Sequence, residues 1–196
     1  MERLIVVPER IFTIEEFFSP DECAHFIELS ERVGYGDAPV TTTTGPQMRS
    51  DIRNNARVLL DDPALALNLW ERIAPFVPSP LWKRTAIGLN ERLRFYRYDP
   101  GQTFKPHYDG SFKRDNGERS QVTFMVYLNG DFTGGATKFD LPYPYHEVSV
   151  QPKAGMALLF WHSLRHEGAP VWSGRKYVLR SDVMYSALPP GETEDI

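Results

Sequence analysis

The second half of the chain reads as a run of short strands joined by tight turns, and this feature restricts the fold more than any other. In "QVTFMVYLN", residues 121–129, purely apolar positions alternate with mixed ones, as in a half-buried strand. The residues of the mixed face are those expected to line a water-filled cavity. Further runs of this kind are "RLRFYRY", "VSVQPKAGMALLFWH" and "GRKYVLRSDVMY", with Pro and Gly turns between them. Strands this short and closely spaced predict a jelly-roll or β-barrel.

The first half of the chain predicts helices. "SPDE" at residues 19–22 combines Ser as N-cap, Pro at the first helical position and Glu three residues after the cap, which is a capping box. A helix should run from there to about Arg32. A second helix is expected from Pro63 to Ala74, because prolines follow it directly. Between the two, residues 34–57 are rich in Gly, Pro and Thr and predict either an irregular connection or a functional lid.

The length of the chain suits one domain. Its 196 residues, 41% of them hydrophobic, are enough to bury a core. We therefore expect a single α+β, mainly β domain. Residues 1–90 would form an N-terminal helical support layer with the lid loop, and residues 91–190 would form the β core.

Composition also narrows the partners and the compartment. A net charge of −4 gives no global basic field, which argues against nucleic acid as a partner. Cys23 is the only cysteine, so neither an intramolecular disulfide nor a cysteine-based zinc cluster can form. The apolar run Leu4–Val7 is too short for a signal peptide or a membrane span. We expect a cytoplasmic protein without a membrane partner.

A candidate metal site begins with "KPHYDG". If this stretch is a strand, His107 and Asp109 project to the same side, which is the spacing of a metal chelate and also of an ordinary polar strand edge. A third ligand is needed, and "FWHSLRHEG" offers His162 and His166. A turn at Ser163 would leave His166 near the start of the next segment. Two histidines and one carboxylate are the donor set of non-haem Fe(II) oxygenases, with zinc as the rival metal.

A lysine further along the chain distinguishes an iron site that binds 2-oxoglutarate from a zinc site. "GRKYVLR" places Lys176 at the start of a strand, on the same face as Val178 and Arg180. An oxygenase that uses 2-oxoglutarate must bind a dianion, whose distal carboxylate needs a cation in the cavity. Fe²⁺ with one aspartate carries a charge of +1, the dianion brings this to −1, and a lysine returns it to zero. A buried charge without a partner is costly, and a zinc hydrolase has no such need.

Taken together, these motifs resemble the iron(II)- and 2-oxoglutarate-dependent oxygenases, and are most similar to their prolyl 4-hydroxylase-like branch. The resemblance covers residues 92–185 and rests on "YDPGQTFKPHYDG", "TFMVYLN", "GGATKF", "PKAGMALLFWHSLRHEGAPV" and "GRKYVLRSDVMY". It implies a double-stranded β-helix, the jelly-roll of this family. It also implies a set of site residues: the catalytic iron ligands His107, Asp109 and His166, Lys176 as anchor of the distal 2-oxoglutarate carboxylate, and the pocket tyrosines Tyr127 and Tyr98.

The implied reaction consumes O₂ and 2-oxoglutarate and releases succinate and CO₂ while an unactivated C–H bond is hydroxylated, with ascorbate as an auxiliary cofactor. The resemblance favours a prolyl or other residue of a peptide or protein as substrate. Three alternatives stay open: a hydroxylase of a free amino acid or other small molecule, a non-catalytic iron or 2-oxoglutarate sensor, and a nucleic-acid dealkylase, against which the acidic charge argues.

Some residues have two interpretations. Arg180, Arg53 and Asn55 are candidate substrate contacts, but Arg180 is equally suited to an ion pair with Asp182 or another structural carboxylate. His162 is either a hydrogen-bond donor to the metal site or a packed residue that binds no metal. Ala136 stands where many relatives of this branch have a glutamate, which affects the turn rather than the chemistry.

Overall fold

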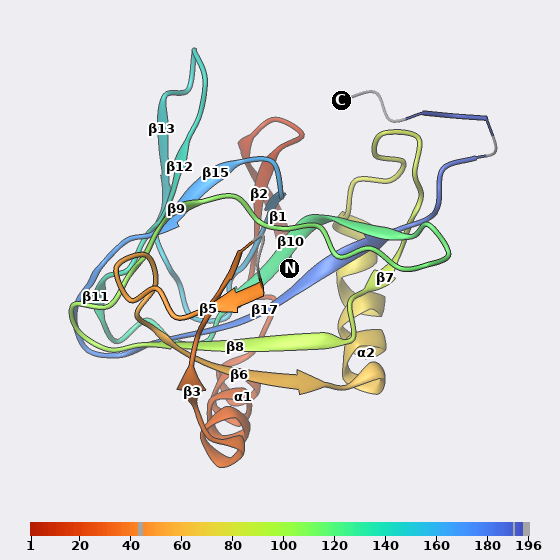
Figure 1. The fold of residues 1–196 in the computed structure, drawn as a ribbon. Coiled ribbons are helices and arrows are strands. Elements are labelled where there is room, and N and C mark those ends of the chain that lie inside the picture. The colour runs from red at the N-terminus through yellow and green to blue at the C-terminus, as the bar shows by residue number, and fades with distance from the viewer. Residues whose placement is uncertain (43–44, 190, 194–196) are drawn as a thin grey trace.

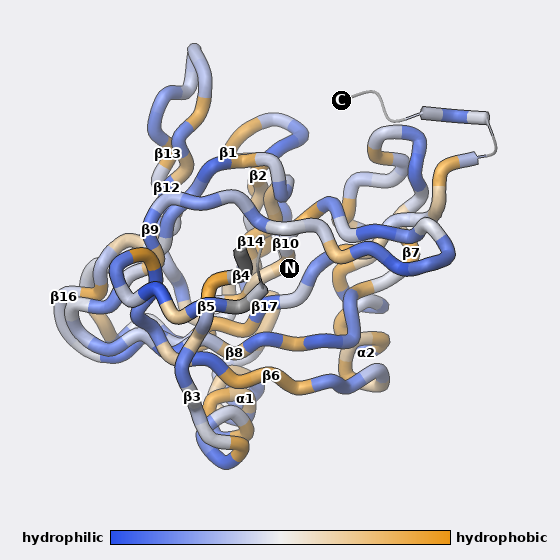
Figure 2. The backbone as a smooth tube through the Cα atoms, in the orientation of Figure 1, coloured by the Kyte–Doolittle hydropathy of each residue, from blue (hydrophilic) through white to orange (hydrophobic). Residues whose placement is uncertain are grey.

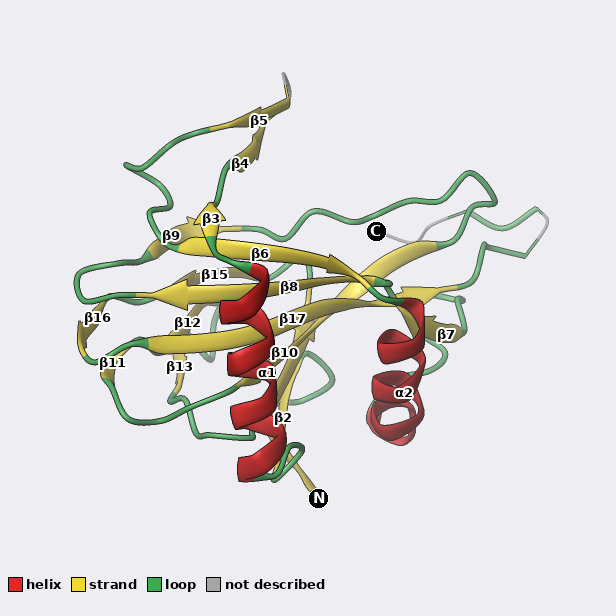
Figure 3. Cartoon of the chain, turned by 90° about the horizontal axis from the view of Figure 1, so that it is seen from below, coloured by secondary structure: helices red, strands yellow, loops and turns green. Residues whose placement is uncertain are grey.

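In the computed structural model, which describes residues 1–42, 45–189 and 191–193, two β-sheets face each other and two helices lie against the larger sheet (Figures 1 and 3). In the described residues, the larger sheet contains nine strands. Its order is β1 (Glu2–Val7), β2 (Ile11–Glu15), β14 (Ala157–Trp161), β10 (Arg119–Tyr127), β17 (Lys176–Tyr185), β8 (Arg92–Tyr98), β6 (Ala56–Asp61) and β3 (Gly36–Asp37), with β7 (Ala86–Leu89) also paired to β17.

The smaller sheet and two short ribbons complete the β structure of the described residues. The smaller sheet has the order β13 (Glu147–Val150), β12 (Thr137–Asp140), β15 (Arg165–Gly168) and β9 (Phe104–His107). The ribbons pair β11 (Thr133–Gly134) with β16 (Val171–Ser173), and β4 (Val40–Thr42) with β5 (Gly45–Gln47). The predicted mainly β fold with a jelly-roll core is confirmed.

Both predicted helices are present and begin at their predicted residues. Helix α1 runs over Pro20–Val33, and Ser19 accepts a hydrogen bond from the Glu22 N–H while the Glu22 carboxylate accepts one from the Ser19 N–H. Helix α2 runs over Pro63–Ile73 with Asp62 as N-cap, and a 3₁₀ turn, η1 (Ala74–Phe76), follows it. Figure 2 shows hydrophobic segments on both helices and on β6. Neither helix is long and apolar enough to cross a membrane.

Two apolar clusters occupy the two faces of the larger sheet. One contains Phe26 of α1, Leu69 of α2 and Phe124 of β10, and fills the space between the helices and the sheet. The other contains Tyr127 of β10 and Phe139 of β12, and lies between the two sheets. Strand β10 therefore has the two faces that its alternation predicts, one toward the helices and one toward the interior of the jelly-roll.

Residues 1–90 contribute more than a helical support layer, because they also supply β1, β2, β3, β6 and β7 to the larger sheet. We assigned no strand to "LIVVPERIFTIE". Its first strand is an exposed edge and its second is buried on both faces, so neither shows a clear alternation of apolar and polar residues. Since strands from both halves of the chain interleave in one sheet, we propose that they form one domain.

The segment 34–57 is not a single irregular loop in the described residues. It contains β3, the hairpin β4–β5 and the start of β6, and Figure 3 shows the hairpin projecting beyond the layers (Figure 3). Residues 43 and 44, in the predicted lid, lie outside the described residues. A role for this segment as a lid stays a prediction.

Candidate metal centre

The structure brings His107, Asp109 and His166 together in the cavity between the sheets. His107 is the last residue of β9 and His166 lies on β15, and the two are register partners across this strand pair. Each of the three residues offers one ligand atom, and these atoms lie within 4.8 Å of one another. We had expected Asp109 to lie on the same strand as His107, but it lies two residues beyond the end of β9. Its backbone N–H donates to the carbonyl oxygen of His162 at 3.3 Å, which holds the carboxylate at the site.

Backbone carbonyl groups fix the orientation of both imidazoles. Nδ1 of His107 lies 2.8 Å from the Lys105 oxygen, and Nδ1 of His166 lies 2.9 Å from the Leu164 oxygen. A carbonyl oxygen only accepts, so Nδ1 carries the proton and Nε2 presents its lone pair to the site. The two Nε2 atoms lie 3.8 and 3.6 Å from the carboxylate oxygens of Asp109. This is the arrangement in which histidine ligands are held in metal centres.

The protonation states also suit a metal. Burial, followed by the nearby His166, lowers the pKa of His107 to about 3, and burial lowers the pKa of His166. Burial by itself would raise the pKa of Asp109, but Arg180 and the surrounding histidines lower it well below its usual range. Near neutral pH the site therefore holds two neutral imidazoles and one carboxylate, which are the forms that bind a metal ion.

The carboxylate of Asp109 is held on both oxygens. Arg180 Nη1 lies 2.8 Å from Oδ1, and Thr123 donates from Oγ1 to Oδ2 at 2.5 Å. Arg180 also contacts Asp182 at 3.0 Å, and Asp182 accepts a hydrogen bond from Arg94 at 2.9 Å. The predicted ion pair of Arg180 with Asp182 is thus present, together with a contact to Asp109 that we did not predict.

Aromatic rings enclose the two histidines. The Phe104 ring stacks on His107 with centroids 3.5 Å apart, and the Phe160 ring lies edge-on to His166 at 4.6 Å. His162 is only 6% exposed and lies 3.5 Å from Asp182, outside the three-residue cluster. His162 is therefore not one of the candidate ligands, and its role as a hydrogen-bond donor or as a packed residue stays a prediction.

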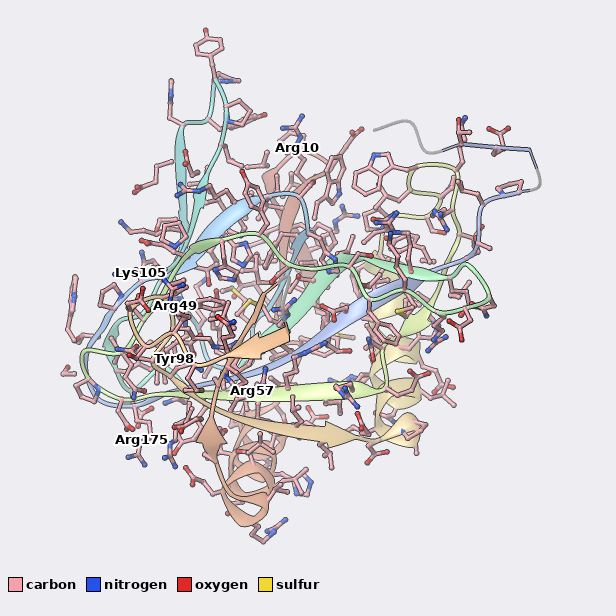
Figure 4. The ribbon with its side chains drawn as sticks, viewed as in Figure 1. Arg10, Arg49, Arg57, Tyr98, Lys105 and Arg175 are labelled. Carbon is pink, nitrogen blue, oxygen red and sulfur yellow. The ribbon has the colours of Figure 1, made fainter. Side chains whose placement is uncertain are left out.

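Lys176 lies in the same cavity as the candidate metal ligands. The cavity is lined by Tyr96, Tyr98, Phe104, His107, Asp109, Thr123, Met125, Thr137, Phe160, His166, Gly168, Lys176, Val178 and Arg180. Lys176 is 2% exposed, and its Nζ donates to the Gly135 oxygen at 2.6 Å. Burial lowers the pKa of Lys176 to about 7. The neighbouring Arg175 projects outward and pairs with Asp99 at 2.6 Å (Figure 4).

The two predicted pocket tyrosines lie on either side of Lys176. Its Nζ is 5.2 Å from the ring centre of Tyr98 and 5.3 Å from that of Tyr127. Tyr98 lines the cavity, whereas Tyr127 lies behind Thr137, to which its hydroxyl is hydrogen-bonded at 2.7 Å. The turn before Thr137 needs glycine, because Gly135 has φ of 66° and a Cβ there would lie 3.1 Å from the Lys176 side chain.

The two candidate substrate residues of the 34–57 segment are buried next to the cavity. Arg53 is 5% exposed, and its guanidinium lies 4.5 Å from the ring centres of both Tyr96 and Phe104. Its Nε donates to Asn55 Oδ1 at 2.7 Å. Neither residue lines the cavity directly, but Arg53 contacts two aromatic residues that do.

The sequence matches a known enzyme family. A family model described as the 2OG-Fe(II) oxygenase superfamily matches residues 93–181, a range that includes His107, Asp109, His166 and Lys176. Prolyl 4-hydroxylase 1 of Arabidopsis thaliana is 28% identical over an alignment of 196 positions. This alignment covers 86% of this chain and 66% of that protein. The chain belongs to the 2OG-Fe(II) oxygenase superfamily.

Solved prolyl hydroxylases share the fold of this oxygenase. The viral collagen prolyl hydroxylase vCPH from Paramecium Bursaria Chlorella virus-1, solved as a 2OG complex, has a TM-score of 0.61 at 22% identity over 93% of this chain and 99% of that chain. The prolyl hydroxylase from Trichoplax adhaerens, solved with a hypoxia inducible factor peptide fragment, has a TM-score of 0.68 at 16% identity over 90% and 84% of the two chains.

The predicted family, its prolyl 4-hydroxylase-like branch and the dioxygenase class are therefore confirmed. The chain spans about two thirds of the length of the plant prolyl 4-hydroxylases that it matches. The family match ends at Ser181, directly before Asp182. The ion pairs that Asp182 makes with Arg94 and Arg180 thus extend beyond the segment that the family model covers.

Proposed function

We propose that this oxygenase binds Fe(II) and 2-oxoglutarate and hydroxylates an unactivated C–H bond in a residue of a peptide or protein, with a prolyl residue as the first candidate. One observation carries the proposal. The two Nε2 atoms and one carboxylate of the candidate centre converge in a cavity that also contains a buried lysine. A zinc hydrolase would have no use for that lysine.

The residues present fit the metal and the co-substrate. His107, His166 and Asp109 would hold Fe(II), since both histidines have their Nδ1 atoms engaged and Asp109 is ionised. With three ligands from the protein, the bound metal would keep positions for 2-oxoglutarate and O₂. With these bound, the iron supplies the oxidising chemistry that converts C–H to C–OH, with succinate and CO₂ as co-products.

The chain itself orients the reactants and limits access of water. Lys176 would pair with the distal carboxylate of 2-oxoglutarate, and it is available because its contact in this structure is a neutral carbonyl oxygen. Arg180 and Thr123 hold the Asp109 carboxylate in place, so that it need not reorganise when the metal binds. Phe104 and Phe160 cover the histidines, which keeps the centre in a medium of low polarity.

The choice of a peptide substrate rests on the relatives. Curated relatives are plant prolyl 4-hydroxylases, and a prolyl hydroxylase of the same fold was solved with a peptide fragment. We propose that Arg53 and Asn55 contribute to substrate binding, because Arg53 contacts two aromatic residues of the cavity wall. Ascorbate is proposed as an auxiliary reductant that keeps the iron in its Fe(II) state.

The test is formation of succinate from 2-oxoglutarate under O₂ with Fe(II), together with a mass-spectrometric search for products 16 mass units heavier. The search covers a proline-containing peptide pool and, separately, free amino acids. Succinate with a peptide product supports the proposal, and a product from free amino acids alone would assign the small-molecule alternative. Binding of 2-oxoglutarate without any succinate would instead indicate a sensor.

A further inference from the structure

A row of arginines lies on the cavity side of the larger sheet. On β6, Val58 packs into the cluster beneath the helices, so Arg57 is on the opposite face of that strand. Arg57 is the register partner of Tyr96, which lines the cavity. On the next strand pair, Arg94 is the register partner of Arg180. Three guanidinium groups therefore share the face that carries the candidate metal centre.

Positive charge exceeds negative charge on this face. Among its described residues, three arginines have acidic partners: Arg92 pairs with Asp61, Arg94 with Asp182, and Arg180 with both Asp182 and Asp109. Arg53 and Arg57 have no acidic partner among the described residues. Arg53 donates only to the neutral side chain of Asn55. The side chain of Arg57, a residue paired in the sheet with β8 and β3, makes no hydrogen bond or ion pair with any described residue.

The two remaining arginines are not ordinary surface cations. Arg53 is nearly buried, and its Nη2 has no hydrogen-bond partner in the described part of the chain. Arg57 is half-buried. Burial lowers its pKa most, Tyr96 opposes this lowering, and the positive charges of Arg53, Arg94 and Arg92 add to it. Holding cations together in this way is costly unless an anion lies among them.

The proposed metal and co-substrate do not supply that anion. Fe²⁺, Asp109, the 2-oxoglutarate dianion and Lys176 together sum to zero charge, and Asp182 is already paired with Arg94 and Arg180. The excess charge at Arg53 and Arg57 remains. Arg53 is separated from the centre by one layer of rings, because it lies against Phe104 and Phe104 stacks on His107. Arg57 is the register partner of Tyr96, which lines the cavity. A substrate that reaches the metal would pass close to both arginines.

We propose that Arg57, supported by the free edge of the Arg53 guanidinium, binds a carboxylate of the substrate, so that this oxygenase selects substrates with a carboxylate near the hydroxylated carbon. The inference rests on the proposed function and deepens it. A guanidinium presents its donors in a planar fork that matches a carboxylate. The carboxylate has two sources, an acidic side chain or the α-carboxylate of a chain end or free amino acid. Figure 4 labels Arg57 on the ribbon (Figure 4).

The test uses matched substrate pairs that differ in one charge. Amidated proline peptides with glutamate on either side of the proline are compared with their glutamine counterparts, which isolates the side chain. Peptides with free and amidated C-termini, and proline with prolinamide, isolate the α-carboxylate. Turnover is measured as product 16 mass units heavier, and binding is measured by calorimetry with Mn(II) in place of iron. Saturating 2-oxoglutarate in both assays prevents the carboxylate probes from occupying the Lys176 site.

In wild type we expect at least one pair to favour the carboxylate member about tenfold or more. Arg57→Ala should remove that preference. Binding of the carboxylate member should weaken about tenfold to a hundredfold, as expected for loss of a charge-assisted hydrogen bond, while binding of the amide member is unchanged. Arg57→Gln, which keeps the side-chain carbons as far as Cδ but removes the charge, should behave like Arg57→Ala and covers a folding failure of the latter. Arg32→Ala removes the same charge from an exposed site on α1 and should leave the preference intact.

Two results would overturn the inference as a whole, and a third would overturn its choice of ligand. One is equal binding of carboxylate and amide members by wild type across every pair, and the other is an equal loss for both members in Arg57→Ala. A stronger, Arg57-dependent preference for phosphoserine over glutamate peptides would overturn the carboxylate assignment. The calorimetric arm decides the inference independently of turnover. Absence of succinate under every condition would count against the proposed function instead.

Discussion

The Nη1 atom of Arg180 lies 2.8 Å from Oδ1 of Asp109, so the carboxylate that we propose as a metal ligand is already part of a buried ion pair. The same guanidinium contacts Asp182 at 3.0 Å, and both carboxylates are almost fully buried. Arg180 thus offsets two buried negative charges. We therefore expect loss of Arg180 to lower the stability of the fold, in addition to any effect on catalysis.

We expect Arg180→Met to lower the free energy of unfolding by about 3–5 kcal/mol, because it leaves buried carboxylates without their partner. Chemical unfolding of the metal-free protein measures this. Mn(II) should recover part of the loss, since a metal that binds only the folded state stabilises it. Arg175→Ala is the control, because this half-exposed arginine pairs with Asp99 on the outside, and its loss should cost under about 1 kcal/mol. Equal stability of Arg180→Met and wild type would contradict the proposed role.

We expect Lys176→Ala to weaken 2-oxoglutarate binding by roughly two to three and a half decades, because the distal carboxylate would lose its buried partner at a cost of about 3–5 kcal/mol. Titration with Mn(II) in place of iron measures the affinity without turnover. Lys176→Arg should rescue it only in part, since the guanidinium has a different reach and shape. A large loss in Arg175→Ala with little change in Lys176→Ala would reverse the assignment.

We expect the affinity for 2-oxoglutarate to fall by about tenfold per pH unit above about pH 7. Without the co-substrate, burial lowers the pKa of Lys176 to about 7, whereas a bound carboxylate would raise it, so binding takes up a proton above that pH. The mutant Lys176→Arg keeps its charge and should show no such dependence. The lowered pKa of Lys176 also makes the stability of the fold depend on pH. The unfolded lysine binds more protons between about pH 7 and 10.5, so the contribution of Lys176 to stability rises across that window.

We expect His107→Ala to weaken Mn(II) binding by more than about a hundredfold, since loss of a ligand should exceed the tenfold to hundredfold effect of losing a residue that only orients one. Calorimetry or the paramagnetic resonance signal of free Mn(II) measures this. His25→Ala, at an exposed histidine of α1, should bind the metal like wild type. Wild-type affinity in His107→Ala would show that the three residues do not form the metal centre.

The features that sequence analysis predicted well depend on neighbours along the chain. The capping box at Ser19 and the two faces of β10 are set by residues within one turn or one strand, so they can be read locally. The contact between Arg180 and Asp109 could not be, because it depends on where the chain leaves β9. The charge surplus at Arg57 was equally hidden, since it appears only when β6, β8 and β17 lie side by side.

The interleaving of the larger sheet bears on how this protein can be shortened. Strand β2, which carries β1 on its outer side, pairs with β14, and β6 pairs with β8 at the other side, so the first half of the chain covers both flanks of the strands of the second half. A fragment starting at residue 91 would expose β14 and β8 as unpaired edges and also lose the helices that cover one face. Open edges of this kind pair with other chains. Such a truncation should therefore aggregate rather than yield a minimal catalytic core, even though every proposed metal ligand lies within it.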